Sequence, residues 1–177
     1  MNNVTVASGT ASAPQSLAIG ANTISILVTA QDGITANTYT LSVTRLTNAE
    51  DWRVQNFGTS SNAGIAADTA DPDGDGLTNL QEYISGTQPG AFQPPLLTMS
   101  SANGNIVLTF TARQAGGAGY AGLTRYYDLQ GTTDLANASS WAPVSGYAGI
   151  VGANQTVTLT VPTSGAPRFF RLKAWLQ

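Results

Sequence analysis

The sequence predicts a mainly β chain with one short helical segment in its middle. Near both ends, apolar residues alternate with Thr and Ser, and this period of two is typical of strands with one buried face. Between these runs, residues 47–92 hold seven of the ten acidic residues and several helix start and stop signals. We therefore expect two β-sandwich-like parts, residues 1–46 and 93–177, joined by residues 47–92.

The first β part contains two alternating runs. Their apolar members are Ile24, Ile26 and Val28, then Tyr39, Leu41 and Val43. Asp32-Gly33 lies between the runs and is a hairpin-turn signal. The two runs should therefore pair as a β-hairpin with one apolar face.

Three short patterns follow one another in this part. They are L-x-x-G-x-N-x-I from Leu17, V-x-A-x-D-G from Val28 and Y-x-L-x-V-x-R from Tyr39. Together they resemble the second half of a bacterial cadherin-like β-sandwich repeat. The first half of that repeat is missing, so the resemblance implies an incomplete sandwich with an open edge and an uncovered apolar face.

The helical segment opens with Thr47-Asn48-Ala49-Glu50, which has the S/T-x-x-E form of a capping box. A short helix should follow through Phe57 and end at Gly58. We expect Trp52 and Phe57 to anchor this helix in a core.

A second helix is expected from Thr78 to Ile84, ended near Gly86 and Pro89. A single pair of short helices usually needs a partner surface. We expect the apolar side chains of this region to pack on a neighbouring β part: Leu77, Leu80, Tyr83 and Ile84.

Between the two helices, residues 71–82 spell D-P-D-G-D-G-L-T-N-L-Q-E. They match the twelve-residue calcium-loop pattern D-x-[DN]-x-[DN]-G-x5-E at every position. Carboxylates at positions one, three, five and twelve supply hard oxygen ligands, and Gly76 permits the sharp turn at position six. The candidate metal ligands are Asp71, Asp73, Asp75, the Leu77 carbonyl, Asn79 (directly or through water) and Glu82.

The alternative interpretation of these residues is an acidic, glycine-rich surface turn. Four carboxylates this close repel one another unless a cation lies between them, which favours a divalent-cation site. Asp68, three residues before the loop, is a further candidate ligand from outside it, and the sequence leaves its role open.

The segment from Trp52 to Pro89 contains a longer pattern around this loop. W-R…N-F-G…A-A-D precedes the loop, and E-Y…G-T-Q-P begins at its last residue. It resembles a calcium-binding linker found near the C-termini of large bacterial exported proteins. The loop is also similar to those of thrombospondin type 3 repeats and dockerins. The resemblance implies that calcium folds and stiffens the segment. A dockerin needs a second copy of the loop, and none is present, so cellulosome docking is not expected.

Residues 93–177 return to strand patterns. Their inward candidates are Ile106, Leu108 and Phe110, then Val157, Leu159 and Val161. The last run, Arg168 to Leu176, places Phe170, Leu172 and Ala174 on one face and Phe169, Arg171, Lys173 and Trp175 on the other. Short strands with Gly- and Pro-rich turns favour a β-sandwich.

Three further patterns lie within this part: Y-D-L-Q-G-T-T-D-L from Tyr127, W-A-P-V from Trp141 and R-F-F-R-L from Arg168. They resemble the immunoglobulin-like domain that often follows this type of linker. The resemblance implies an immunoglobulin-like sandwich for residues 93–177.

Composition excludes several classes of function. The formal net charge is −3 and only 10% of residues are charged, with no basic patch, so nucleic-acid binding is not expected. The chain has no Cys and no His, which removes thiol nucleophiles, Ser-His-Asp triads and most zinc sites. No run is long and apolar enough to span a membrane. No signal peptide precedes the first strand pattern, so we expect the chain to be part of something larger or to start too late.

Neither a dinucleotide-binding site nor a pair of catalytic carboxylates is well supported by the sequence. Gly117 to Gly122 spell G-x-G-x-x-G, but a strand pattern follows where a dinucleotide site needs a helix, so we expect a flexible loop. Outside the helical segment only Asp32, Asp128 and Asp134 remain as carboxylates, and no pair has the spacing that glycoside hydrolysis needs. We expect no enzymatic activity.

Sugar binding is an open alternative, because aromatic faces stack on the apolar faces of sugar rings. The candidates are Tyr120, Tyr126, Tyr147, Trp141 and Trp175. The competing expectation, which we favour, is that Trp141 and Trp175 fill the sandwich core. Three coplanar exposed rings would decide for a carbohydrate module.

The functional hypothesis is a non-enzymatic, calcium-stabilised structural or adhesive protein, secreted by a bacterium or held at its surface. Calcium fits that location because extracellular levels saturate weak sites. The expected partner is a second copy of the chain, added as a strand to build a filament, with Asn2 to Ser8 or Arg168 to Gln177 as the pairing segment. The competing explanation for the incomplete sandwich is that the strands of residues 3–45 pack onto the C-terminal sandwich of the same chain. The alternative is a carbohydrate-binding accessory module of a larger secreted enzyme.

Overall fold

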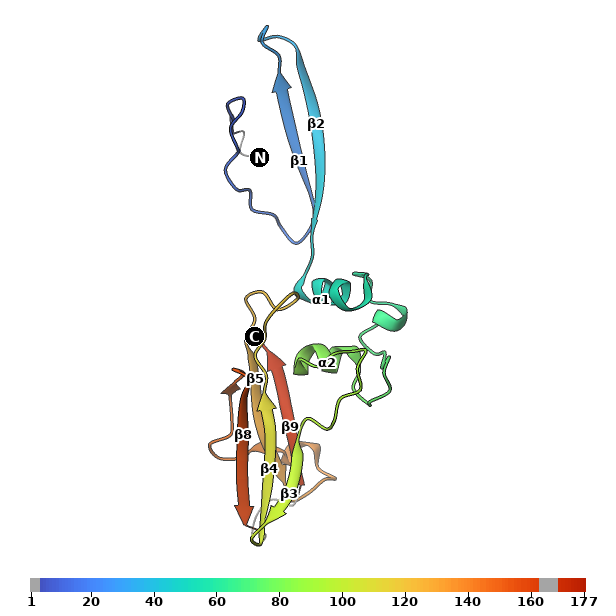
Figure 1. Ribbon diagram of the computed structural model, residues 1–177, viewed down its shortest axis with the longest axis vertical. Coiled ribbons are helices and arrows are strands. Elements are labelled where there is room, and N and C mark those ends of the chain that lie inside the picture. The colour runs from blue at the N-terminus through green and yellow to red at the C-terminus, as the bar shows by residue number, and fades with distance from the viewer. Residues whose placement is uncertain (1–3, 163–168) are drawn as a thin grey trace. The chain divides into compact units, whose positions relative to one another are not determined.

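The computed structural model describes residues 4–162 and 169–177, and these form nine strands, two α-helices and two short 3₁₀ helices (Figure 1). The chain is mainly β, as the sequence predicts. It divides into two compact units, Met1–Thr47 and Asn48–Gln177, so that the helical segment and the second β part share one unit. The separation of residues 47–92 from residues 93–177 stays a prediction.

The first unit contains one antiparallel hairpin, β1 (Gly20–Thr29) and β2 (Ala36–Arg45). The predicted turn at Asp32-Gly33 is confirmed. The Asp32 carboxylate accepts the Ile34 and Thr35 amides at 2.9 and 2.8 Å, and Gly33 has φ 69°.

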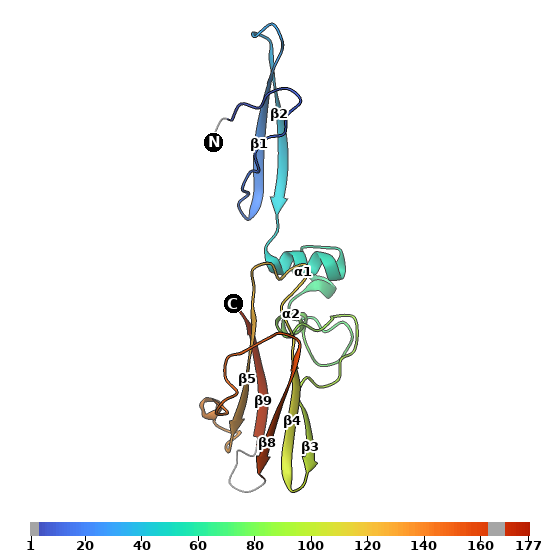
Figure 2. The same cartoon turned by 60° about the vertical axis from the view of Figure 1, so that its left-hand side comes forward.

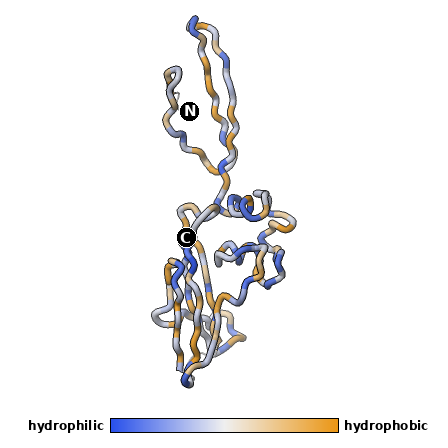
Figure 3. The backbone as a smooth tube through the Cα atoms, viewed as in Figure 1, coloured by the Kyte–Doolittle hydropathy of each residue, from blue (hydrophilic) through white to orange (hydrophobic). Residues whose placement is uncertain are grey.

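One face of this hairpin is apolar and uncovered. Directly opposed residues share a face, and Ile24 opposes Leu41 while Ile26 opposes Tyr39. Figure 3 shows hydrophobic segments along both strands. In the described part of this unit Ile26, Tyr39 and Leu41 remain 46%, 58% and 51% exposed. The described residues of this unit therefore form two strands of a sheet without the second sheet of a sandwich.

The second unit is built on two sheets. The first has the order β3 (Thr98–Ala102), β4 (Asn105–Ala112), β8 (Gln155–Pro162). In the second, β5 (Arg125–Thr132) pairs along its length with β9 (Phe169–Leu176) and with the short strands β6 (Ala142–Pro143) and β7 (Ile150–Val151). All pairings are antiparallel. Figure 2 labels β3, β4 and β8 of one sheet and β5 and β9 of the other.

The core lies between these two sheets. Its buried members come from β4, β5 and β8: Leu108, Phe110, Ala112, Tyr127, Leu129 and Val161. The predicted inward face of β9 is confirmed, because Phe170, Leu172 and Ala174 pack against this cluster. Such face-to-face packing of alternating side chains is that of a β-sandwich.

Both predicted helices are present. Helix α1 (Asn48–Phe57) ends at Gly58, which has φ 71° and donates its amide to the Val54 carbonyl at 2.9 Å. Trp52 is 5% exposed, and Phe57 meets its ring edge-on at 5.9 Å. Two 3₁₀ turns, η1 (Gly64–Ala66) and η2 (Ala138–Ser140), lie in the connections.

Helix α2 (Asn79–Ser85) follows the acidic loop. Thr78 and Gln81 form a reciprocal capping box at its start, and Gly86 ends it in the left-handed region. Tyr83 is buried as expected, but Leu80 is 44% exposed, so its predicted packing on a β part is wrong. The buried side of this two-turn helix holds Asn79, Glu82 and Tyr83, which are three and four residues apart, and Leu80 falls off that side.

One prediction about the second β part is also wrong, namely that Trp141 and Trp175 fill its core. Trp141 and Trp175 are not in the described core: Trp175 stacks on Tyr126 at 5.6 Å, and Arg171 lies over Trp141 at 4.4 Å. The alternation that turns Phe170, Leu172 and Ala174 inward turns Trp175 outward.

The G-x-G-x-x-G segment is a loop that packs tightly on α1 rather than a free one. The Gly119 amide donates to the Asp51 carboxylate at 2.8 Å, and a Cβ added at Gly119 would lie 2.5 Å from Trp52 Cβ. Only glycine permits this approach, so Gly119 serves packing on a helix.

Candidate calcium site

The acidic loop is shaped by its own carboxylates. Asp71 accepts the amides of Gly74 and Gly76 at 2.9 and 3.0 Å, one on each oxygen. Asp73 and Asp75 each accept the amide two residues further on, at 3.2 and 2.8 Å. Gly76 has φ 91°, which allows the chain to turn sharply here. These bonds wind the backbone so that alternate side chains face the same space.

The first three predicted ligands are brought together. One carboxylate oxygen from each of Asp71, Asp73 and Asp75 lies within 4.8 Å of the others. Acidic groups also gather without an ion on many protein surfaces, so this cluster alone does not define a site.

The helix that follows carries two further predicted ligands, Asn79 and Glu82, both completely buried at 0% exposure. Among the described residues, the group of carboxylates within 4.8 Å of one another holds the three Asp residues and does not include Glu82. The Asn79 amide nitrogen donates to the carbonyls of Ile65 and Ala67 at 2.8 and 2.7 Å. One Glu82 oxygen accepts the Thr87 hydroxyl at 3.3 Å. Each side chain thus uses one polar atom in hydrogen bonds to the protein, while its other oxygen, Asn79 Oδ1 or Glu82 Oε2, has no partner among the described residues.

Three buried side-chain atoms lack a hydrogen-bond partner in the described part of the chain: Asp73 Oδ2, Asn79 Oδ1 and Glu82 Oε2. All three are oxygens of residues that the sequence pattern names as ligands. Buried polar groups in native proteins almost always have a partner, so three exceptions within one twelve-residue loop require an explanation. A bound cation supplies one.

Electrostatics point the same way. Burial raises the pKa of Glu82 from 4.5 to about 7, with further increases from Asp73 and Asp75 and an opposing contribution from the Thr87 hydroxyl. An ionised carboxylate is therefore disfavoured here without a counter-charge. The loop behaves as a set of hard oxygen donors that is repulsive when empty of positive charge.

Asp68, whose role the sequence left open, is engaged elsewhere. One of its oxygens pairs with Arg53 at 2.7 Å and the other accepts the Asn62 amide at 3.0 Å. Its backbone carbonyl accepts the Leu80 amide at 3.0 Å. Asp68 therefore braces the loop against α1 and α2 from outside.

Sequence reasoning missed three supports of the loop. Thr87 bonds Glu82, the carbonyls of Ile65 and Ala67 orient Asn79, and the Gln93 amide donates to the second oxygen of Asp75 at 3.0 Å. Thr87 stands in the G-T-Q-P end of the linker pattern, which was its only signal.

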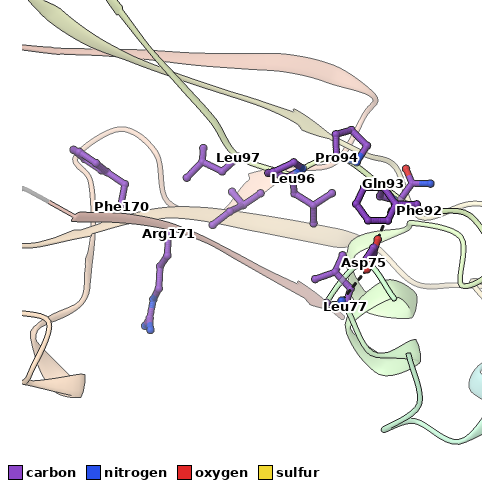
Figure 4. A pocket seen from close by; sticks show the side chains of 12 residues that line it. Asp75, Leu77, Phe92, Gln93, Pro94, Leu96, Leu97, Phe170 and Arg171 are labelled. Atoms are coloured by element: carbon purple, nitrogen blue, oxygen red, sulfur yellow. Dashed lines mark hydrogen bonds between the residues drawn. The ribbon is translucent and has the colours of Figure 1, made fainter. Parts of the chain in front are cut away.

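Beside the loop lies an open cavity of about 520 Å³, between Asp75 to Leu77, the segment 92–97 and the start of β9 (Figure 4). Its lining includes one carboxylate, Asp75, and one guanidinium, Arg171. The Asp75 carboxylate is occupied by the Leu77 and Gln93 amides. This lining offers no pair of carboxylates for acid–base chemistry.

Among the residues that the structure describes, no helix has the length and apolar character needed to cross a membrane.

Comparison with known proteins gives one match. The family model described as "Cadherin-like beta sandwich domain" matches residues 1–46 of the 177-residue chain. No curated protein and no solved structure matches. The match confirms the cadherin-like part of the resemblance seen in the sequence. Domains of this kind are generally non-enzymatic and typically extracellular, which suggests an adhesive or structural module. The acidic loop, residues 71–82, lies outside the matched residues.

Proposed function

We propose that residues 71–82 bind one calcium ion and that the chain is a non-enzymatic, extracellular, calcium-stabilised structural or adhesive module. The ligands are Asp71, Asp73, Asp75, the Leu77 carbonyl, Asn79 and Glu82. The observation that supports this most is the set of three buried oxygens without partners, all on these residues.

Energetics favour a cation in this loop. Each unsatisfied buried polar group costs about 1–3 kcal/mol, and more when it is charged. One divalent ion would satisfy all three oxygens and also offset the repulsion among four carboxylates. An all-oxygen set with a Glu that can bind through both oxygens suits calcium, whereas magnesium prefers a tighter octahedral shell and keeps its waters.

The structural role follows from where the ligands sit. Asp71, Asp73 and Asp75 belong to the loop, while Asn79 and Glu82 belong to α2, which packs near β9. An ion held by both sets would tie the loop to the helix and so to the sandwich. Calcium in this position stiffens the helical segment of the second unit.

Titration calorimetry of the whole chain tests the proposal. We expect one calcium ion per chain, weak competition by magnesium, and loss of binding in Asp73→Asn, which keeps the shape of the side chain. Asp134→Asn, an exposed acidic residue outside the loop, serves as the control and should bind as the wild type does. Absence of binding at millimolar calcium would refute the site.

A second candidate, self-association into a filament, is favoured by the uncovered apolar face of the hairpin. Ile26, Tyr39 and Leu41 expose about half of their surface, and a two-stranded hairpin is only marginally stable alone. Residues 4–8 form no strand, and Val4 and Val6 are 56% and 41% exposed, so this segment is available for strand addition. Asn2 and Asn3 lie outside the described residues.

The other pairing segment named from the sequence is already used within the chain. Strand β9 pairs with β5 from Phe169 to Leu176, which leaves only its other edge for a neighbouring copy. Arg168 lies outside the described residues.

The carbohydrate alternative loses its expected platform. Trp141, Trp175 and Tyr126 are half-buried. Arg171 lies over Trp141, Lys173 lies over Trp175, and Trp175 stacks on Tyr126. The other two candidates are also engaged, because Tyr120 stacks on Tyr83 at 5.0 Å and Tyr147 packs against the core. The five rings therefore offer no exposed coplanar group of three.

A further inference from the structure

The C-terminal end of α2 is held by side chains from β5 and from the segment that connects β4 to β5. The last carbonyls of a helix have no partner within it and must find one elsewhere. In α2 the Tyr83 carbonyl accepts the Tyr120 hydroxyl at 2.8 Å, and the Ile84 carbonyl accepts Arg125 Nε at 2.6 Å. The Ser85 carbonyl accepts the Tyr127 hydroxyl at 3.4 Å. The Gly86 carbonyl, just past the helix, accepts Arg113 Nη1 at 2.9 Å.

Arg125 is the centre of this arrangement. Its side chain is among the largest fully buried ones, at 1% exposure. Besides Ile84 it donates to the carbonyls of Tyr83 at 3.3 Å and Gln114 at 2.9 Å, and its guanidinium lies 4.9 Å from the centre of the Tyr120 ring. None of its hydrogen bonds in the described residues goes to a carboxylate. Its charge instead faces the negative end of the α2 dipole.

The Arg125 guanidinium packs tightly against the end of α2. Gly86 lies so close that an added Cβ would be 2.3 Å from Arg125 Nη1 and 2.7 Å from Cζ. The guanidinium therefore fixes the position of the helix end, and a shift of α2 along its axis would break several of these bonds at once.

The same seven-residue helix holds two of the proposed calcium ligands, Asn79 and Glu82. Glu82 also links the acidic loop to the C-terminal end of α2. Its side chain is a proposed ligand, and its backbone carbonyl accepts the amides of Gly86 and Thr87 at 2.7 and 3.1 Å. Thr87 in turn bonds the Glu82 carboxylate. Anything that displaces the helix end moves the ligand.

We propose that Arg125 is a positioning residue for the calcium site, acting through α2, so that calcium affinity depends on the docking of this helix against the sandwich. This inference rests on the proposed calcium site. Linkage makes the effect reciprocal, because a contact that favours the calcium-competent position of α2 is itself favoured by calcium. The ion and the sandwich thus stabilise each other although Arg125 touches no ligand side chain.

Calorimetry of Arg125→Met in the full chain tests this at pH 8. We expect calcium affinity about tenfold lower than in the wild type, in the usual range of coupling between sites. Lys173→Met is the matched control. Lys173 is an exposed cation on the outer face of the same sheet, and its substitution by Met removes the same positive charge. Loss of a positive charge alone would raise the affinity for a cation slightly, so the expected decrease has the opposite sign to a purely electrostatic effect.

A second pair of variants, Tyr120→Phe and Tyr126→Phe, tests the same coupling with smaller changes in case Arg125→Met misfolds. Tyr120→Phe removes only the hydroxyl that binds the Tyr83 carbonyl, and we expect about threefold weaker calcium binding. Tyr126→Phe removes the hydroxyl of a ring on the outer face, and its affinity should be unchanged. Near-ultraviolet circular dichroism in saturating calcium should show native signals for both.

The outcomes separate the two proposals. If the wild type binds calcium and both Arg125→Met and Tyr120→Phe bind as tightly as their controls, the coupling is refuted and the calcium site stands. If the wild type does not bind, the calcium site is refuted and this inference falls with it. The reciprocal readout is thermal: calcium should raise the melting temperature of Arg125→Met less than that of the wild type.

Discussion

Replacing Glu82 by Gln separates the two consequences of burying a carboxylate in this loop. In the calcium-free protein, burial and the neighbouring Asp73 and Asp75 raise the pKa of Glu82 from 4.5 to about 7. The folded state then binds the proton more tightly than the unfolded state does. The contribution of this group to stability is therefore complete below pH 4.5 and is lost as the pH rises to about 7.

The magnitude follows from the same two values. One pKa unit corresponds to about 1.4 kcal/mol, so a rise from 4.5 to about 7 amounts to about 3 kcal/mol lost by pH 8. At pH 5 only about 1 kcal/mol of it is lost, because most of the titration lies at higher pH. Gln carries no charge and loses nothing. Without calcium, Glu82→Gln should therefore be more stable than the wild type by about 3 kcal/mol at pH 8 and by about 1 kcal/mol at pH 5.

Calcium should reverse this order. The wild type gains from selective binding of the ion to the folded state, by about 4.1 kcal/mol at about one thousand times its dissociation constant, which exceeds its deficit of about 3 kcal/mol at pH 8. Gln offers one neutral oxygen in place of two charged ones, so the variant should gain little. Urea unfolding in chelator at pH 5 and pH 8, and in calcium at pH 8, measures all three differences.

Equal stability of the two proteins in chelator at pH 8 would refute the reasoning, because it would mean that the Glu82 carboxylate is not destabilised by its surroundings. Asp134→Asn provides the control for removal of an exposed acidic group, and its stability should track that of the wild type at both pH values.

Three further predictions follow from the same contacts. Glu82→Ala should lower calcium affinity more than Asn79→Ala, and equal affinities in calorimetry would contradict the ligand roles. Asn79→Ala should also destabilise the calcium-free protein by about 1–3 kcal/mol in urea unfolding, since it removes the donor to the Ile65 carbonyl and one of the two donors to the Ala67 carbonyl. Gly86→Ala should cost about 2 kcal/mol or more, from left-handed strain and displacement of a buried guanidinium, whereas Gly90→Ala has open space and should be nearly neutral; thermal melts in calcium compare them, and matching melting temperatures would count against the tight fit. Deleting residues 1–8 should leave soluble monomers if these residues add as a strand to a neighbouring copy; light scattering that shows the full chain strictly monomeric at high concentration with calcium would end the filament proposal.

Local patterns carried most of the predictions that proved right. The acidic cluster was visible because the calcium-loop pattern places its carboxylates at fixed spacings within twelve residues, and the structure brings the three Asp side chains together. That this cluster binds calcium stays a prediction. The ends of α1 and α2 were visible because Gly58 and Gly86 each supply the left-handed conformation that stops a helix. The inward residues of β4 and β9 follow from alternation alone.

Contacts distant in sequence left no such signal. Arg125 binds the carbonyl of Ile84, 41 residues earlier, and nothing in its own strand pattern distinguishes it from an exposed charge. Likewise Gly119 needs to be glycine because of Trp52, not because of its own segment. The expectation that Trp141 and Trp175 fill the core fails because a large aromatic ring also covers the outer face of a sheet when a guanidinium or ammonium lies beside it.

The most direct test of the proposed calcium site is a crystal structure of the chain grown in calcium, with the anomalous signal of the ion measured. One peak is predicted inside the loop, at roughly 2.3–2.6 Å from oxygens of Asp71, Asp73, Asp75 and Glu82 and from the Leu77 carbonyl. Asn79 Oδ1 should face the same ion, directly or through one water. A structure with calcium present and no peak in the loop, or with the three orphan oxygens bound to protein groups instead, would contradict the account.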